Sequence, residues 1–267
     1  WNNFPIAKLS AGNDYLNPNF ELIIDDTIEQ NPKQKLIDFT SKWIQTKINT
    51  ILKSLIDLKN LKEKNSSIKA LAYQLYENNG VLKREQVSEY LKKLGQNERK
   101  ILRELGVKFG RYHVFLYQLI KPEAVSLRTL LWKNFHQKYH KLKPPTFGLN
   151  FLDDQEARNR NFMLLCGFEK FENLFVRIDI LERLFMQIIN SNSKENKEIK
   201  MVPEMLNLLG CSKDNFKKLL KKMGYKIFDK EEETFFKYSP LKQFKKNPVK
   251  KVSSENPFKV LKNLNLG

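Results

Sequence analysis

Residues 201–238 read MVPEMLNLLGCSKDNFKKLLKKMGYKIFDKEEETFFKY, and their periodicity is the strongest structural signal in the chain. The apolar spacing predicts two short helices, Pro203–Leu209 and Asp214–Met223, separated by a tight turn. Two β-prone segments follow, Tyr225–Phe228 and Thr234–Tyr238, and the acidic residues between them suit a hairpin turn. Helix, turn, helix and hairpin is the element order of a winged helix-turn-helix.

Five lysines fall on the outward face of the second of these helices: Lys213, Lys217, Lys218, Lys221 and Lys222. In DNA-binding modules of this kind the second helix enters the major groove. Side chains that read base edges are usually Arg, Asn or Gln, whereas lysine supplies a point charge that suits phosphates. The face therefore predicts phosphate contacts with weak sequence preference. The alternative is a solvated lysine face on a small helical domain.

Upstream of this stretch the apolar spacing predicts a series of helices. They are expected over residues 31–61, 67–78, 83–94, 97–105 and 122–139. Residues 1–30 are expected to be irregular and residues 107–115 extended. The segment Lys141–Leu149 (KLKPPTFGL) contains two adjacent prolines, which cannot continue a helix. Beyond it we expect a helix over 154–165, an extended segment over 168–176 and a helix over 177–189.

The fold class expected from these segments is mainly α. A helical, bundle-like accessory domain would occupy residues 1–140 and a linker residues 141–150. A small α+β domain of winged-helix type would occupy residues 151–238, followed by a disordered basic tail over 239–267. No internal sequence repeat is visible.

Composition excludes several classes of protein. The 267 residues are 41% hydrophobic and 12% aromatic, which is enough for a packed core and argues against global disorder. No apolar stretch approaches the roughly 18 residues of a membrane helix, so we expect no membrane partner. Two cysteines cannot form a disulfide scaffold. No Gly-x-x-x-x-Gly-Lys-Ser/Thr loop is present, so nucleotide hydrolysis would lie outside these residues.

A net charge of +18 predicts a polyanionic partner, because lysines that neutralise phosphates release counterions. Compositional drift, a membrane surface or an acidic protein are the alternatives. Residues 237–267 carry eight lysines and one acid, and Lys245, Lys246, Lys250 and Lys251 are candidate contacts there. In residues 132–143, Lys133 and Lys138 alternate with aromatic rings that either stack on bases or form the buried face of a helix.

No residues combine into a convincing catalytic or metal site. His136 and His140 have the i, i+4 spacing of zinc ligands on one helix, but a third ligand and a glutamate base are missing. The paired acids Asp25-Asp26 and Asp153-Asp154 suit helix starts. Cys166 is expected to be a core thiol. Cys211 lies at a helix start, where thiolate is favoured, but no base accompanies it. We therefore predict no catalytic residue, metal or cofactor in this chain.

Four stretches in order resemble one family: IKALAYQLYENNGVLKREQV (68–87), LRELGVKFGRYHVFLYQLIKPEAVSLRTLLW (102–132), CGFEKFENLFVRIDILER (166–183) and MLNLLGCSKDNFKKLLKKMGY (205–225). Together they resemble the C-terminal half of bacterial DExH-box helicases related to the RNA helicase of the mitochondrial degradosome. The resemblance implies ATP- and magnesium-dependent motor domains elsewhere in the protein. It makes Lys108 and Arg111 candidate nucleic-acid contacts, with solvent exposure of both and of His113 at a strand edge as the alternative.

The expected function is therefore that of the nucleic-acid-binding C-terminal region of an RNA helicase that grips RNA through its phosphates. The expected partners are RNA, the motor domains and an exoribonuclease or ribosome, in the cytoplasm or the mitochondrial matrix. The chain starts at Trp1 rather than Met, which suggests a fragment or a processed product. The alternatives are a helical protein–protein adaptor of an RNA-processing or ribosomal complex and a winged-helix DNA-binding protein.

Overall fold

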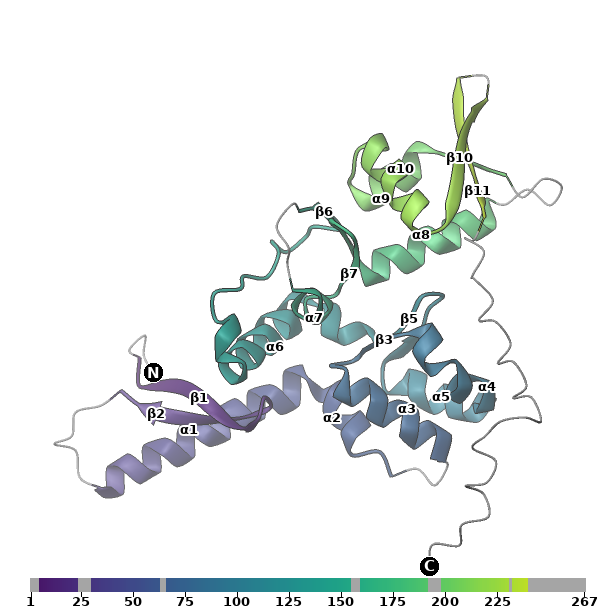
Figure 1. Ribbon diagram of the computed structural model, residues 1–267. Coiled ribbons are helices and arrows are strands. Elements are labelled where there is room, and N and C mark those ends of the chain that lie inside the picture. Colours follow the sequence, from purple (N-terminus) through teal and green to yellow (C-terminus); the bar gives the residue numbers. More distant parts are fainter. Residues whose placement is uncertain are drawn as a thin grey trace, which may run out of the picture.

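A computed structural model describes residues 5–23, 30–62, 66–154, 159–191, 198–230 and 232–239. Helices account for 54% of the described residues and strands for 23%, so the fold is mixed, and mainly α is only an approximation. The strands of the described residues form small antiparallel sheets distributed along an elongated molecule (Figure 1). The predicted basic tail, including Lys245, Lys246, Lys250 and Lys251, lies outside the described residues from position 240 onward.

The chain begins with a hairpin rather than the irregular segment predicted for residues 1–30. Strands β1 (Ala7–Asp14) and β2 (Asn17–Leu22) pair antiparallel. The Asp14 carboxylate accepts the backbone N–H groups of Leu16 at 2.7 Å and Asn17 at 3.0 Å, which closes the turn. The hairpin lies between α1 (Gln30–Ile51) and α6 (Pro122–Phe135). Asn, Gly and Pro within these strands disfavour β structure, so the sequence did not predict the hairpin.

The same order of elements then occurs three times within the described residues. Each unit has a helix, a single strand, one or two further helices and a hairpin. The second strand of the hairpin also pairs with that single strand. Residues 66–116 form unit 1, residues 122–177 unit 2 and residues 178–238 unit 3. The three sheets have the orders β3-β5-β4, β6-β8-β7 and β10-β11-β9, so in each the last strand is central. The sequence itself shows no repeat.

Unit 1 follows α2 (Lys53–Lys59) and contains α3 (Ser66–Glu77), β3 (Val81–Lys83), the 3-10 turn η1 (Arg84–Val87), α4 (Ser88–Lys93), α5 (Gln96–Glu104), β4 (Val107–Phe109) and β5 (His113–Leu116). The turn η2 (Tyr117–Ile120) leads into unit 2, which contains α6, the turn η3 (Gln137–Tyr139), β6 (Phe151–Asp153), α7 (Arg160–Leu165), β7 (Phe168–Phe171) and β8 (Leu174–Arg177). Unit 3 contains α8 (Ile178–Asn190), β9 (Ile199–Lys200), α9 (Pro203–Leu209), α10 (Lys213–Lys222), β10 (Tyr225–Lys230) and β11 (Glu233–Tyr238). Residues 141–150, predicted as a linker, connect α6 to β6.

Corresponding backbone hydrogen bonds show that the three units are alike in detail. A glycine with positive φ precedes each hairpin: Gly106, Gly167 and Gly224, at 90°, 86° and 87°. Its carbonyl accepts the N–H of the residue that follows the hairpin, at 3.3 Å from Tyr117, 2.9 Å from Ile178 and 2.9 Å from Ser239. Only glycine adopts this backbone region without strain, so the three positions require it.

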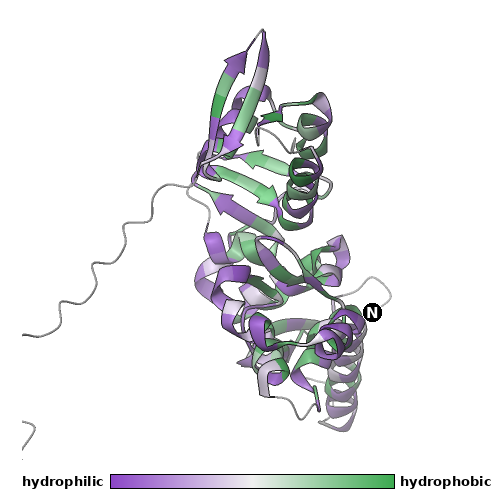
Figure 2. Ribbon diagram, turned by 90° about the vertical axis from the view of Figure 1, so that its right-hand side faces the viewer, coloured by the Kyte–Doolittle hydropathy of each residue, from purple (hydrophilic) through white to green (hydrophobic). Residues whose placement is uncertain are grey.

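Apolar side chains cluster separately along the chain. One cluster joins the hairpin, α1 and α2 to unit 1, a second lies in unit 2, and a third fills unit 3 and takes in Phe151, Leu174 and Val176 of unit 2. Figure 2 shows helices with a hydrophobic side and a hydrophilic side, as expected for helices that cover a core with one face.

Candidate nucleic-acid interface

A cleft of about 590 Å³ lies where the three units meet. Five cationic side chains line it: Lys83, Arg84, Arg111, Lys170 and Lys222. Among the described residues of its wall, Glu85 and Glu169 are the acids. The cations come from all three units, so only the assembled fold brings them together. A concave wall that carries one predominant sign of charge concentrates counterions of the other sign.

The carboxylate of Glu182, on α8 of unit 3, fixes the loop at the mouth of the cleft. It accepts the backbone N–H groups of Tyr112 and His113, each at 2.9 Å, and that of Arg111 through a short contact. A side chain at Gly110 would overlap this carboxylate, which explains the glycine at that position. The loop 110–113 of unit 1 is therefore held by unit 3.

His113 is buried, so its expected exposure at a strand edge is wrong. Its Nε2 lies 2.8 Å from Glu169 of unit 2 and its Nδ1 lies 3.4 Å from Glu182. The ring is only 2% exposed. Burial opposes the charged form, but the hydrogen bond to Glu169 and the nearby carboxylate of Glu182 raise the pKa of His113 above its ordinary value. One imidazole thus connects all three units.

The buried Glu169 carboxylate is neutralised from several sides. Besides His113, Arg160 lies 3.1 Å and Lys83 lies 3.6 Å away. Burial alone would raise the pKa of Glu169, but the hydrogen bond from His113 and the three neighbouring cations hold it at about 2. Glu169 therefore offsets Lys83, whereas Arg84, Arg111 and Lys170 on the cleft wall form no ion pair with another described residue.

The open side combines free cations with aromatic rings. Arg111 is exposed, lies 5.4 Å from the centre of the Phe185 ring, and has no acidic partner among the described residues. Arg84 donates to the carbonyl of Gly110 at 2.7 Å, which holds its guanidinium at the mouth. Tyr238, 56% exposed, lines the same cleft. Phosphate binding by cations together with ring faces for stacking is the combination found in grooves that hold single strands.

The predicted contact residues divide between the cleft and the outer surface. Arg111 and Lys222 line the cleft, Lys222 paired with Glu172, and Lys218 lines an adjoining hollow. Lys217 lies 3.6 Å from Asp229. The remaining predicted lysines of α10 and β4 are exposed outside the cleft: Lys108, Lys213 and Lys221. The sequence analysis missed Lys83, Arg84 and Lys170, which lie in no lysine run and are recognisable only once the sheets are assembled.

The aromatic segment after α6 is partly buried. Trp132 is 8% exposed and stacks on Tyr139 with ring centroids 5.0 Å apart. Lys133 donates to the carbonyl of Leu142 at 3.1 Å, and Lys138 lies over the Tyr139 ring. Neither lysine lines the cleft. The interpretation of these rings as a packing face is therefore correct for Trp132.

The histidine pair and the two cysteines are not arranged as reactive sites within the described residues. His136 caps the C-terminal end of α6 and His140 lies beyond η3, so they do not share a helix, and the described residues contain no group of metal ligands. Cys166 is buried as predicted. Burial raises the pKa of Cys211 to about 11, contrary to the expected thiolate.

The acidic pairs do not begin helices where the structure describes them. Asp153 ends β6, and α7 begins later, at Arg160, with Asn159 as its cap. The prediction of a helix over 154–165 was therefore too long. Asp25-Asp26 lies outside the described residues.

Comparison of the chain with known protein families, with curated proteins and with solved structures found no match. Within the described residues, no helix is both long enough and apolar enough to cross a lipid bilayer.

Proposed function

We propose that this chain is the nucleic-acid-binding C-terminal region of an ATP-dependent RNA helicase. It would hold single-stranded or partly paired RNA by its phosphates, with ATP hydrolysed by motor domains elsewhere in the protein. The observation that carries the proposal is the cleft at the junction of the three units, with five cations on its wall. Lys83 and Lys222 lie beside Glu169 and Glu172. Arg84, Arg111 and Lys170 form no ion pair with another described residue, so their charges are available to a polyanion.

The resemblance to the helicase family and the geometry of the cleft support each other. The stretch GVKFGRYHVFL includes the loop that Glu182 holds and the exposed Arg111. In the proposal, the helix–helix–hairpin of unit 3 is a winged helix, and so are the corresponding elements of unit 1. The proposal assigns phosphate contacts that do not depend on RNA sequence to the lysines of α10 and to four lysines of the tail, Lys245, Lys246, Lys250 and Lys251.

A salt titration tests the proposal directly. The logarithm of the association constant for a single-stranded RNA of 12 nucleotides should fall with the logarithm of salt concentration by roughly 0.7 per phosphate neutralised. If all five cleft cations neutralise phosphates, the slope should be about −3.5. Arg111→Ala should make the slope shallower by about 0.7. Lys42→Ala, an exposed lysine on α1, should leave it unchanged.

Two results would contradict the proposal in different ways. A flat salt dependence would show that phosphates are not the ligand. A steep slope that Arg111→Ala leaves unaltered would show that RNA binds by phosphates at another surface.

An exposed apolar groove supports one second candidate, the protein–protein adaptor. It has a volume of about 570 Å³ and lies between the hairpin, α1 and α6. Phe39, Trp43 and Leu130 on its wall are 55%, 54% and 48% exposed. Copurification of a protein partner that persists after nuclease treatment and is abolished by Trp43→Ser would favour this function over RNA binding.

A further inference from the structure

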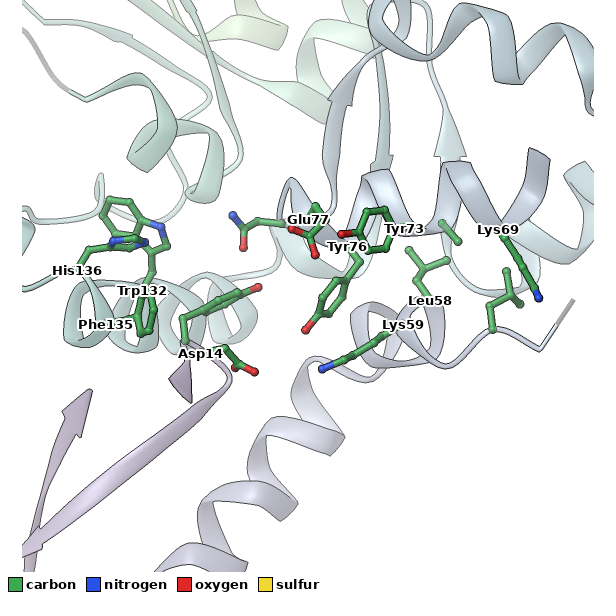
Figure 3. A pocket seen from close by; sticks show the side chains of 14 residues that line it. Asp14, Leu58, Lys59, Lys69, Tyr73, Tyr76, Glu77, Trp132, Phe135 and His136 are labelled. Carbon is green, nitrogen blue, oxygen red and sulfur yellow. The ribbon is translucent and has the colours of Figure 1, made fainter. Parts of the chain in front are cut away.

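A second hollow, of about 760 Å³, differs in chemistry from the cleft. It lies between the turn of the N-terminal hairpin, α2, α3 and the end of α6. Figure 3 shows Trp132, Phe135 and His136 on one side, Tyr73 and Tyr76 on the other, and Asp14 between them. The described residues of its wall include two acids and two lysines, so it has no excess of positive charge to attract phosphate.

The rings of this pocket are held in place by their neighbours. Trp132 is fixed by stacking on Tyr139 and by contact with His136 at a centroid distance of 4.6 Å. Lys59 lies 5.2 Å from the centre of the Tyr76 ring. Tyr73, by contrast, is 60% exposed. A set of braced rings with one exposed tyrosine at the entrance suits a flat, uncharged ligand.

Two residues that line the pocket each carry a buried polar atom with no hydrogen-bond partner in the part of the chain that the structure describes. These atoms are the Tyr15 hydroxyl and Oδ1 of Asn79. Burial raises the pKa of Tyr15, so its hydroxyl keeps its proton and can donate as well as accept. Because buried polar groups are nearly always paired, a ligand that carries both a donor and an acceptor would satisfy these two atoms once their side chains turn toward the pocket.

We propose that this pocket accepts one unstacked base of the RNA strand whose phosphates lie in the cleft. Every nucleobase offers a flat ring for stacking and a donor beside an acceptor on its Watson–Crick edge. The inference rests on the proposed function, since it requires a bound strand.

The walls of the pocket and the cleft are connected by a short stretch of chain. Asn79 on the pocket wall and Lys83 on the cleft wall are four residues apart in sequence. Their Cα atoms are therefore separated by at most roughly 14 Å, a span that a short oligonucleotide covers.

The experiment compares a uridine 12-mer with an abasic 12-mer, a sugar-phosphate strand of equal charge without bases, by fluorescence polarisation with the full chain. The uridine strand should bind at least about fivefold more tightly, because stacking on an aromatic ring and hydrogen bonding favour the base. Tyr73→Ala should reduce this ratio towards one. Tyr117→Ala, which removes another exposed tyrosine, should preserve it and serves as the matched control.

Tyr15→Phe provides a variant that should not affect folding. The Tyr15 hydroxyl forms no hydrogen bond with another described residue, so its removal should not lower the melting temperature. The ratio of the affinities for the uridine and abasic strands should fall. A ratio near one in the unmodified protein, or an unchanged ratio in Tyr15→Phe, overturns the inference. If the abasic strand still binds with steep salt dependence, the proposed function survives that result. Failure of both strands to bind would instead refute the proposed function.

Discussion

Replacing Glu182 by alanine should weaken the junction of the three units, because one carboxylate accepts three backbone N–H groups of the loop 110–113. The N–H groups of Tyr112 and His113 donate at 2.9 Å in partly buried surroundings. A hydrogen bond to a charged group contributes about 1.5–3 kcal/mol. Arg111 is exposed, so its N–H regains water. Counting two bonds, we expect Glu182→Ala to lower the free energy of unfolding by about 3–6 kcal/mol.

Urea denaturation measures this loss, followed by circular dichroism and by tryptophan fluorescence. The tryptophans are Trp1, Trp43 and Trp132, so unit 3 contains none, and a separate early transition in circular dichroism would report its release. Glu182→Gln keeps one acceptor oxygen and should lose less. Glu172→Ala removes an exposed carboxylate paired with Lys222 and should cost less than about 1 kcal/mol. Equal losses in Glu182→Ala and Glu172→Ala would refute the reasoning.

The buried charges give the remaining predictions. Glu169 has a pKa of about 2 against an ordinary 4.5, so above pH 4.5 its ionisation contributes on the order of 3 kcal/mol to the free energy of unfolding. This contribution is lost as pH falls from 4.5 through 2. The urea midpoint should therefore drop on acidification, and Glu169→Gln should make that drop smaller. Because the pKa of His113 is raised in the folded protein, protonated His113 stabilises the fold fully below pH 6.5, and this stabilisation is lost as pH rises through the folded pKa. An NMR titration of His113 with a midpoint below 6.5 would contradict this. The fully buried Arg128 donates to the carbonyls of Asn79, Leu119 and Leu165. Arg128→Met should therefore lower the free energy of unfolding by at least about 3 kcal/mol, measured by thermal unfolding. Arg183 is exposed, so Arg183→Met should change it little.

Helices with a clear apolar period could be predicted from the sequence. The two helices and hairpin of residues 203–238 agree with the structure within a few residues, and Ser212 caps α10 by accepting the N–H of Asn215. Local signals determine these elements, so no distant contact was needed. The long helix expected over 31–61 instead breaks at Leu52, whose ψ of 22° departs from helical geometry.

Features that depend on distant residues could not be predicted. His113 meets carboxylates 56 and 69 positions away in sequence, at Glu169 and Glu182, and no local pattern shows such a pairing. The cleft likewise draws Lys83 and Lys170 from different units. The likeness of the three units could not be predicted, because they share backbone hydrogen bonds rather than residue types, apart from the glycine before each hairpin.

The way the units are joined has a mechanical consequence. Strand β8 ends at Arg177 and α8 begins at the next residue, Ile178, whose N–H also bonds the Gly167 carbonyl. No linker residue separates unit 2 from unit 3. A torque applied to the lysine-bearing end of the molecule would therefore be transmitted directly to the neighbouring hairpin, and through Glu169 and His113 to the sheet beyond it.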